Sequence, residues 1–173
     1  MGEDKAFLTY EGTSFIETAI QKLQPYCSEI IIGSDNPKIS IPDTHRVSDE
    51  IADIGPLGGL YSCLKRSSNE EAIVIPIDTP FLRSQLIDYI LEHSRGYDVT
   101  VVRHGERIHP LTGVYNKAVV PILEEEIKEG HYKILKFIYK TKYRLLDTES
   151  FGEEMFTNIN STEEYERLNR KDR

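Results

Sequence analysis

The chain has 173 residues, of which 39% are apolar and 29% are charged, a composition typical of a folded protein with a substantial core. Its 21 basic and 29 acidic residues give a net charge of −8, which argues against wholesale binding of nucleic acid or of an acidic membrane. No apolar run approaches the roughly 18 residues of a membrane-spanning helix, and no signal peptide precedes the first helix. We therefore expect a single domain over residues 1–173, in the cytoplasm, with Cys27 and Cys63 as free thiols.

Short apolar strands and amphipathic helices alternate over the first hundred residues. Ser14 and Glu17 form a capping box that begins a helix, and Pro25 ends it. Further strands are expected at 30–32, 45–47, 73–77 and 99–102, and further helices at 57–64 and 84–93. This alternation predicts a mostly parallel sheet with helices on both faces, an α/β fold of three layers.

The second half departs from this pattern. A turn at 105–107 and a returning strand at 111–115 predict an antiparallel element at one edge of the sheet. Helices are expected at 117–129 and 134–139, and a strand at 143–146. Residues 151–160 are expected to be irregular, and a capping box at 161–164 opens the last helix.

The strand 73–77 is apolar on both alternating faces, which predicts burial between two layers of helices. It is followed directly by Asp78. In open parallel sheets, ligands bind beyond the carboxyl ends of the strands, where a carboxylate can hold a divalent cation on a polyphosphate. The alternative interpretation is that Asp78 caps the turn before Pro80.

Gly58 and Gly59 fall in the first turn of an expected helix, where each costs roughly 1 kcal/mol relative to alanine. Either another group approaches the backbone closely there, or the helix packs tightly on the sheet. The sequence contains no HExxH motif and no GxSxG elbow. Carboxylates at strand ends (Asp49, Asp78), these glycines and the early Lys5 are the parts of a phosphate and magnesium site, so the residues alone indicate a nucleotide-binding α/β protein.

Several segments together resemble the molybdenum cofactor guanylyltransferases. Residues 1–8 (MGEDKAFL) are similar to the second half of the signature that opens this family, and 55–60 (GPLGGL) are similar to its Gly-Pro-Leu-Ala-Gly-Leu segment. Residues 76–82 (PIDTPFL) resemble its Pro-Cys-Asp-Thr-Pro strand end. His109-Pro110 and the segment 158–164 (NINSTEE) follow in the family's order.

The resemblance implies a Rossmann-like nucleotidyltransferase fold and the transfer of GMP from GTP to molybdopterin with Mg²⁺. It also implies contacts with molybdoenzymes or other proteins of cofactor biosynthesis. In the family, the residue at Lys5 contacts the triphosphate, that at Asp49 contacts the nucleotide, and that at Asp78 binds the metal. The segment formed by Gly55, Pro56, Leu57, Gly58 and Gly59 lines the nucleotide cleft, and His109, Asn158 and Asn160 lie on the cofactor side.

The chain differs from the family pattern in two places. Gly33 stands where the family usually has a polar residue, a contact that Ser34 or Asn36 could supply. The family also begins with a strand and a Leu-x-Gly-Gly-x-Ser-x-Arg loop before the Met-Gly at which this chain starts. We therefore expect an uncovered apolar gap between strands 30–32 and 73–77, and weak phosphate binding, because glycine-loop amides normally cradle phosphates.

Two other functions stay open from the sequence. The chain could be a related nucleotidyltransferase with another base or acceptor, such as a molybdopterin cytidylyltransferase or a phospholactate guanylyltransferase. It could also be a non-catalytic adaptor that keeps the fold without the phosphate loop.

Overall fold

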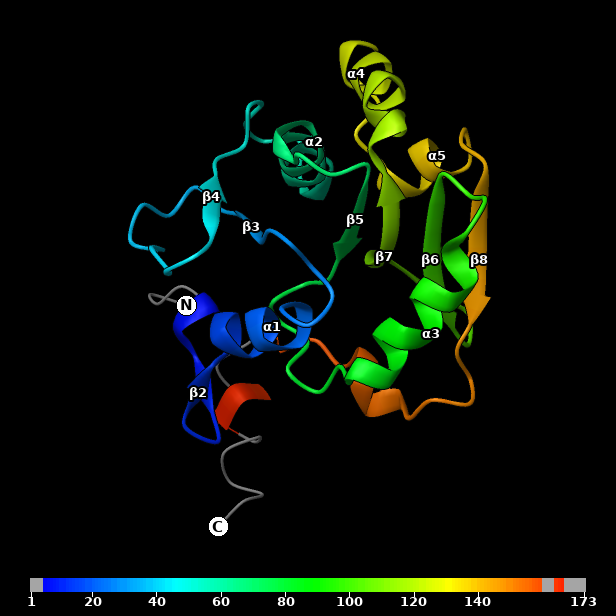
Figure 1. Cartoon of the computed structure of the whole chain (residues 1–173). Helices are drawn as coiled ribbons and strands as arrows, with labels where there is room; N and C mark the ends of the chain where they lie inside the picture. Colours follow the sequence, from blue (N-terminus) through cyan, green and yellow to red (C-terminus); the bar gives the residue numbers. More distant parts are fainter. Residues whose placement is uncertain (1–4, 160–163, 167–173) are drawn as a thin grey trace.

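The computed structural model describes residues 5–159 and 164–166 (Figure 1). The helices are α1 (Phe15–Leu23), α2 (Pro56–Arg66), α3 (Ser84–Ser94), α4 (Val120–Lys128) and α5 (Ile134–Ile138), with short 3-10 helices η1 (Lys5–Phe7), η2 (Lys117–Val119) and η3 (Glu153–Phe156). The strands are β1 (Thr9–Tyr10), β2 (Thr13–Ser14), β3 (Ile31–Gly33), β4 (His45–Val47), β5 (Glu71–Val74), β6 (Val99–His104), β7 (Arg107–Asn116) and β8 (Tyr143–Asp147).

The main sheet has four strands in the order β5-β7-β6-β8, and β3 and β4 form a separate parallel pair. Strand β7 runs antiparallel to both of its neighbours, and β6 and β8 are parallel. The expected antiparallel element is therefore present but lies inside the sheet, so the prediction of an edge position in a mostly parallel sheet was wrong. A tight turn with Gly105 at φ 56° folds β7 back on β6, and its other side pairs with β5.

Two layers of helix cover the main sheet. On one face, α3 packs on β6, β7 and β8. On the other face, α2, α4 and α5 bury a larger apolar cluster. Successive residues of β7 serve the two faces, because Val114 joins the cluster of α3 and Tyr115 joins that of α2 and α4. This arrangement is the three-layer α/β fold expected from the alternation of strands and helices.

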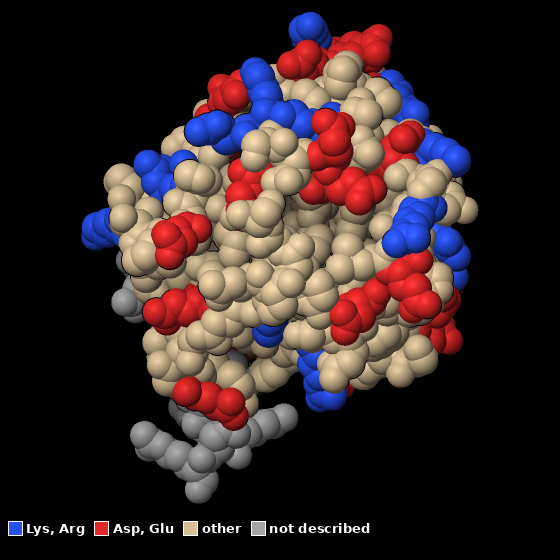
Figure 2. Space-filling view, viewed as in Figure 1, with Lys and Arg blue, Asp and Glu red and all other residues tan. Residues whose placement is uncertain are grey.

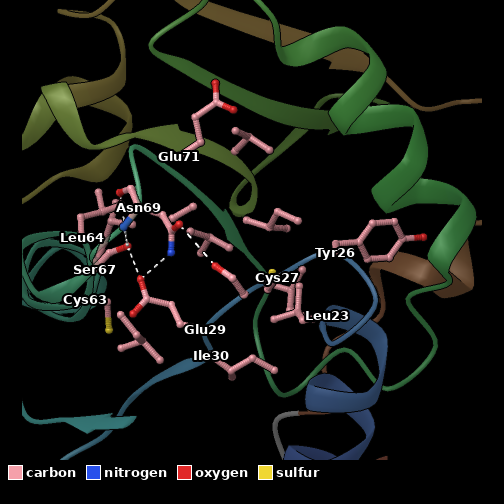
Figure 3. A pocket seen from close by; sticks show the side chains of 18 of the residues that line it. Leu23, Tyr26, Cys27, Glu29, Ile30, Cys63, Leu64, Ser67, Asn69 and Glu71 are labelled. Atoms are coloured by element: carbon pink, nitrogen blue, oxygen red, sulfur yellow. Dashed lines mark hydrogen bonds between the residues drawn. The ribbon is translucent and has the colours of Figure 1, made fainter. Parts of the chain in front are cut away.

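A cavity of about 630 Å³ separates β3 from β5. Residues of both strands line it together with residues of α2, so each strand presents an unpaired edge to the same space (Figure 3). The expectation that the strand at 73–77 is buried was wrong, because Ile73–Ile75 are only half-buried. Ile30–Ile32, on the other side of the cavity, are half-buried as well. The cavity lies where the sequence predicts an apolar gap. In Figure 2, which has the viewpoint of Figure 1, the middle of the molecular surface is largely uncharged.

Glu29 connects the two sides of this cavity. It precedes β3, and its Oε1 atom accepts hydrogen bonds of 2.8–3.0 Å from the Ser67 hydroxyl, from the amide and hydroxyl of Ser68, and from the Asn69 side chain. Ser67–Asn69 link α2 to β5 (Figure 3). Burial raises the pKa of Glu29, but these hydrogen bonds outweigh it and lower the pKa to about 2.

Several local predictions are confirmed. Ser14 and Glu17 form the capping box at the start of α1, and both cysteines are free. The segment expected to be irregular contains the short helix η3. Of the last predicted helix, 164–166 are helical, and the rest of its capping box at 161–163 lies outside the described residues. Among the described helices, none has the length and apolar character needed to cross a membrane.

Candidate active site

Three of the predicted site residues, distant in sequence, meet at one point. The Lys5 ammonium lies 3.8 Å from the Asp78 carboxylate, and the Asn158 side-chain amide lies 3.4 Å from both carboxylate oxygens of Asp78. The Lys5 and Asp78 side chains are 33% and 17% exposed, so a ligand in solution can still reach them. Residues from the beginning, the middle and the end of the chain therefore form one cluster, which contains a cation and a carboxylate.

A small apolar cluster holds this group together. Ala6 and Ile77, the neighbours of Lys5 and Asp78, pack in the same cluster with Ile16 of α1 and with Ile32 of β3. The Asp78 backbone carbonyl also accepts a hydrogen bond from the Ile159 amide at 2.9 Å. Packing beside each functional residue thus fixes its position.

The hydrogen bonds of the turn after Asp78 do not involve the Asp78 carboxylate. The Thr79 hydroxyl donates to the Pro76 carbonyl at 2.9 Å, and the Leu82 amide donates to the Thr79 carbonyl at 3.2 Å. The Asp78 carboxylate instead faces Lys5 and Asn158. Of the two interpretations open from the sequence, the geometry does not support the one in which Asp78 caps the turn.

Lys22 of α1 is a neighbour of this turn that the sequence analysis did not identify. Its ammonium donates to the Pro80 carbonyl, and burial lowers the pKa of Lys22 to about 8. Its signal in the sequence is its spacing, because Lys22 follows the buried Phe15 by two helical turns and so points toward the core.

Asp49 lies in a second group, at the start of α2. Its backbone amide donates to the Asp35 carboxylate at 3.0 Å. Burial, and then the charge of Asp35, raise the pKa of Asp49. Asp35 follows the end of β3, so its place beyond a strand end was the signal that could have identified it.

The space beside the glycines of α2 is already filled. A Cβ on Gly58 would lie 2.9 Å from Ile54, 3.0 Å from the Ile51 carbonyl and 3.1 Å from the Asp49 carboxylate, and one on Gly59 would lie 3.4 Å from Asp49. Close approach of other groups therefore explains why glycine is needed at position 58. These groups belong to the chain segment before α2 and not to a ligand.

The rest of the predicted glycine segment divides into exposed and buried parts. Gly55 has φ 68°, a conformation that favours glycine, and Pro56 follows as the first residue of α2. Both are exposed. Leu57 is 0% exposed, and its side chain packs in the larger core cluster.

His109 belongs to a third group, on β7. Its ring centroid lies 4.9 Å from that of Phe156, which also stacks on His104 at 4.6 Å. Burial, followed by the charges of Arg107 and His104, lowers the pKa of His109 to about 4. Phe156 lies just before Asn158 in the chain, so His109 packs against the segment that carries Asn158. Asn160 lies outside the described residues.

Ser34 and Asn36 both make local contacts around the loop after β3. The Ser34 hydroxyl accepts from the Asn36 amide at 3.2 Å, and the Asn36 side chain accepts from the Lys38 amide at 3.0 Å. Gly33 itself faces α2, where a Cβ would lie 3.0 Å from the Cys63 sulfur.

A three-layer α/β fold in which Lys5 meets Asp78, a carboxylate beyond the end of β5, is compatible with the class of nucleotidyltransferases. The profile of the MobA-like NTP transferase domain matches residues 1–145. The chain belongs to this family.

Relatives and solved structures agree with that assignment. The chain is 33% identical, over 97% of its length and 88% of the other, to a Clostridium perfringens protein named "probable molybdenum cofactor guanylyltransferase". A crystal structure from Aquifex aeolicus superposes with a TM-score of 0.76 at 28% identity, covering 86% of this chain and 80% of that one. Molybdopterin-guanine dinucleotide biosynthesis protein A from Archaeoglobus fulgidus has the same fold, with a TM-score of 0.79, 20% identity and coverage of 99% and 91%.

Proposed function

We propose that the protein is an enzyme that transfers GMP from GTP to molybdopterin, forming the guanine dinucleotide cofactor and releasing pyrophosphate. The observation that carries this proposal is the meeting of Lys5, Asp78 and Asn158, within the family of MobA-like NTP transferases. A cation and a carboxylate held together beside a nucleotide suit chemistry on a triphosphate. We expect the reaction to take place in the cytoplasm, and the product to pass to molybdoenzymes or other proteins of cofactor biosynthesis.

In the proposed reaction, an oxygen of the molybdopterin phosphate attacks the α-phosphorus of GTP. A new P–O bond forms to the α-phosphorus as the bond to the β-phosphate oxygen breaks, and its electron pair leaves with pyrophosphate. The attacking phosphate is already anionic, so the protein mainly positions the reactants and neutralises charge. Lys5 stabilises the negative charge on the phosphate oxygens, and Asn158 orients the Asp78 carboxylate.

The surroundings of Asp78 fit a Mg²⁺ ion. Its contacts with Asn158 at 3.4 Å and with Lys5 at 3.8 Å are longer than the roughly 2.7–2.9 Å of a charge-assisted hydrogen bond. The carboxylate therefore keeps lone pairs for a hard cation, which is commonly held by one or two carboxylates with water and phosphate oxygens. Bound there, the ion would help neutralise the triphosphate.

We assign recognition of guanine to Asp49, supported by Asp35. Guanine presents N1–H and N2–H₂ donors side by side, and one carboxylate can accept from both. Burial and the nearby Asp35 raise the pKa of Asp49, so donors from a bound base would offset the cost of keeping this carboxylate charged. From the resemblance to the family, we propose that the segment of Gly55, Pro56, Leu57, Gly58 and Gly59 lies on the nucleotide side and that His109 and Asn158 lie on the cofactor side. Asn160, the third residue proposed for the cofactor side, lies outside the described residues.

An assay of GMP transfer to molybdopterin in Mg²⁺ tests the proposal. Asp78→Asn is expected to abolish transfer and leave the circular dichroism spectrum unchanged, because it removes one charge without changing side-chain size. Asp43→Asn is the matched control, since Asp43 is an exposed aspartate in the loop before β4. Near-normal turnover by Asp78→Asn would remove Asp78 from this role, and faster transfer from CTP than from GTP would indicate a cytidylyltransferase.

A further inference from the structure

A group of side chains gathers where α4 ends. Glu126 and Glu129 lie one turn apart at the end of this helix, and His131 follows the turn at Gly130. Gly130 has φ 74°, and the His131 amide donates back to the Glu126 carbonyl at 2.8 Å. This backbone turn brings the imidazole of His131 over the two carboxylates.

Two atoms in this group are buried and lack a hydrogen-bond partner in the described part of the chain. They are Oε2 of Glu126 and Nδ1 of His131. The Glu126 side chain is only 1% exposed, so water does not compensate its second oxygen. A hydrogen bond from Lys140 reaches the other oxygen of Glu126. A charged carboxylate is therefore satisfied on one side and unsatisfied on the side that faces His131.

Two distances within the group match those between ligand atoms of one metal ion. His131 Nδ1 lies 3.6 Å from Glu126 Oε2 and 3.1 Å from Glu129 Oε2. One ligand atom from each of the three residues lies within 4.8 Å of the other two. With metal–ligand bonds of about 2.0–2.2 Å, atoms that share a metal ion stand roughly 3.0–3.6 Å apart. A small cation placed between these atoms would need only a modest adjustment of the exposed Glu129 side chain.

We propose that Glu126, Glu129 and His131 form a second divalent-metal site, separate from the nucleotide site and of the kind that binds zinc or cobalt. One imidazole and two carboxylates suit a borderline transition metal with water in the remaining positions. Mg²⁺ prefers an all-oxygen shell, so it does not compete well at a site with a nitrogen ligand. The site would tie the end of α4 to the turn that follows it.

Lys140 is the natural competitor of the ion. Its ammonium binds Glu126 and lies 3.9 Å from Glu129. Lys140 is 45% exposed, so it can move into solvent when a cation of higher charge arrives. Removing its positive charge should therefore strengthen metal binding, whereas losing a ligand should weaken it.

Titration calorimetry with Zn²⁺, after removal of metal with a chelator, tests the proposal on the whole chain in excess Mg²⁺. We expect one ion per chain at this site. His131→Ala and Glu126→Gln should each weaken its binding at least tenfold, and Lys140→Met should strengthen it. Glu125→Gln should leave it unchanged, because Glu125 is an exposed acid of the same helix outside the group. Co²⁺ should give visible absorption bands that His131→Ala removes.

The His131→Ala variant tests the proposed metal site even if Glu126→Gln does not fold normally. His131 is 36% exposed, so its replacement by alanine should be tolerated. Absence of Zn²⁺ binding by the wild type would show that the group is an ion-pair cluster only. Equal affinity of the wild type and His131→Ala would place any bound ion elsewhere. Either result overturns the proposal.

Discussion

Replacing Glu29 by glutamine should destabilise the protein measurably, because this carboxylate connects the two sides of the cavity between β3 and β5. Glutamine keeps the size and one carbonyl acceptor but loses the charge that strengthens the hydrogen bonds from Ser67, Ser68 and Asn69. These bonds lower the pKa from 4.5 to about 2 against the effect of burial. At about 1.4 kcal/mol per pKa unit, the upper bound is about 3 kcal/mol.

The expected loss is smaller than this bound, since Glu29 is only half-buried and water screens its charge. We expect Glu29→Gln to lower the free energy of unfolding by about 1.5 kcal/mol at pH 7. For a chain of this length that corresponds to roughly 3–6 °C in Tm. Glu92→Gln, at an exposed position on α3, serves as the control.

The pH dependence separates this mechanism from a simple packing defect. Because the pKa of Glu29 is lower in the folded state, its stabilisation is complete above about pH 4.5 and is lost as the pH falls toward about 2. Urea unfolding followed by circular dichroism should show a difference between wild type and Glu29→Gln at pH 7 that falls to roughly half or less at pH 3. Equal stabilities at pH 7, or a difference that does not change with pH, would refute the reasoning.

Three further predictions follow from the site and the cavity. Asp49→Ala should weaken GTP binding and reduce the preference for GTP over CTP in titration calorimetry, and equal affinity of the wild type for both nucleotides would contradict the assigned role. His109 has a folded-state pKa of about 4 instead of 6.5. The free energy of unfolding of the wild type should therefore fall by about 1–2 kcal/mol as the pH falls from 6.5 to 4. His109→Gln should lack this loss, and the exposed His45→Gln should retain it. An extension ahead of Met1 that supplies an apolar strand and a Leu-x-Gly-Gly-x-Ser-x-Arg loop should raise Tm and should increase the stabilisation by Mg²⁺–GTP. A Gly/Ser extension of equal length should do neither. No difference between the two extensions would show that the cavity does not accept a strand.

Features that depend on neighbouring residues could be predicted from the sequence. The capping box of Ser14 and Glu17 rests on local spacing, and the structure contains it. The strand expected at 73–77 is Glu71–Val74 in the structure, so Asp78 lies beyond its end but does not follow it directly. The meeting of Lys5, Asp78 and Asn158 has no local signal, because the residues lie far apart in the chain. The resemblance to a family implied a role for each residue, and the structure shows that the three residues meet.

The remaining features depend on tertiary packing. Strand pairing decides that β7 lies inside the sheet, and the periodicity of a strand does not report its neighbours. The apolar strand 73–77 implies burial, yet β5 is half-buried because its free edge faces a cavity. Leu57 shares a motif with exposed glycine and proline, but the helical period turns its side chain into the core. The sequence gives no sign that an oxygen of Glu126 is buried without a hydrogen-bond partner, because this depends on the three-dimensional structure.

The most direct measurement follows the individual phosphates of GTP. The chain, alone and extended ahead of Met1 as above, is incubated with molybdopterin, Mg²⁺ and GTP labelled at either the α- or the γ-phosphate. We expect the α-label to enter the dinucleotide product and the γ-label to leave as pyrophosphate. We also expect Asp78→Asn to lose both signals and Asp43→Asn to keep them. Transfer of γ-label to molybdopterin, or no transfer by either form of the chain, would contradict the proposed guanylyl transfer.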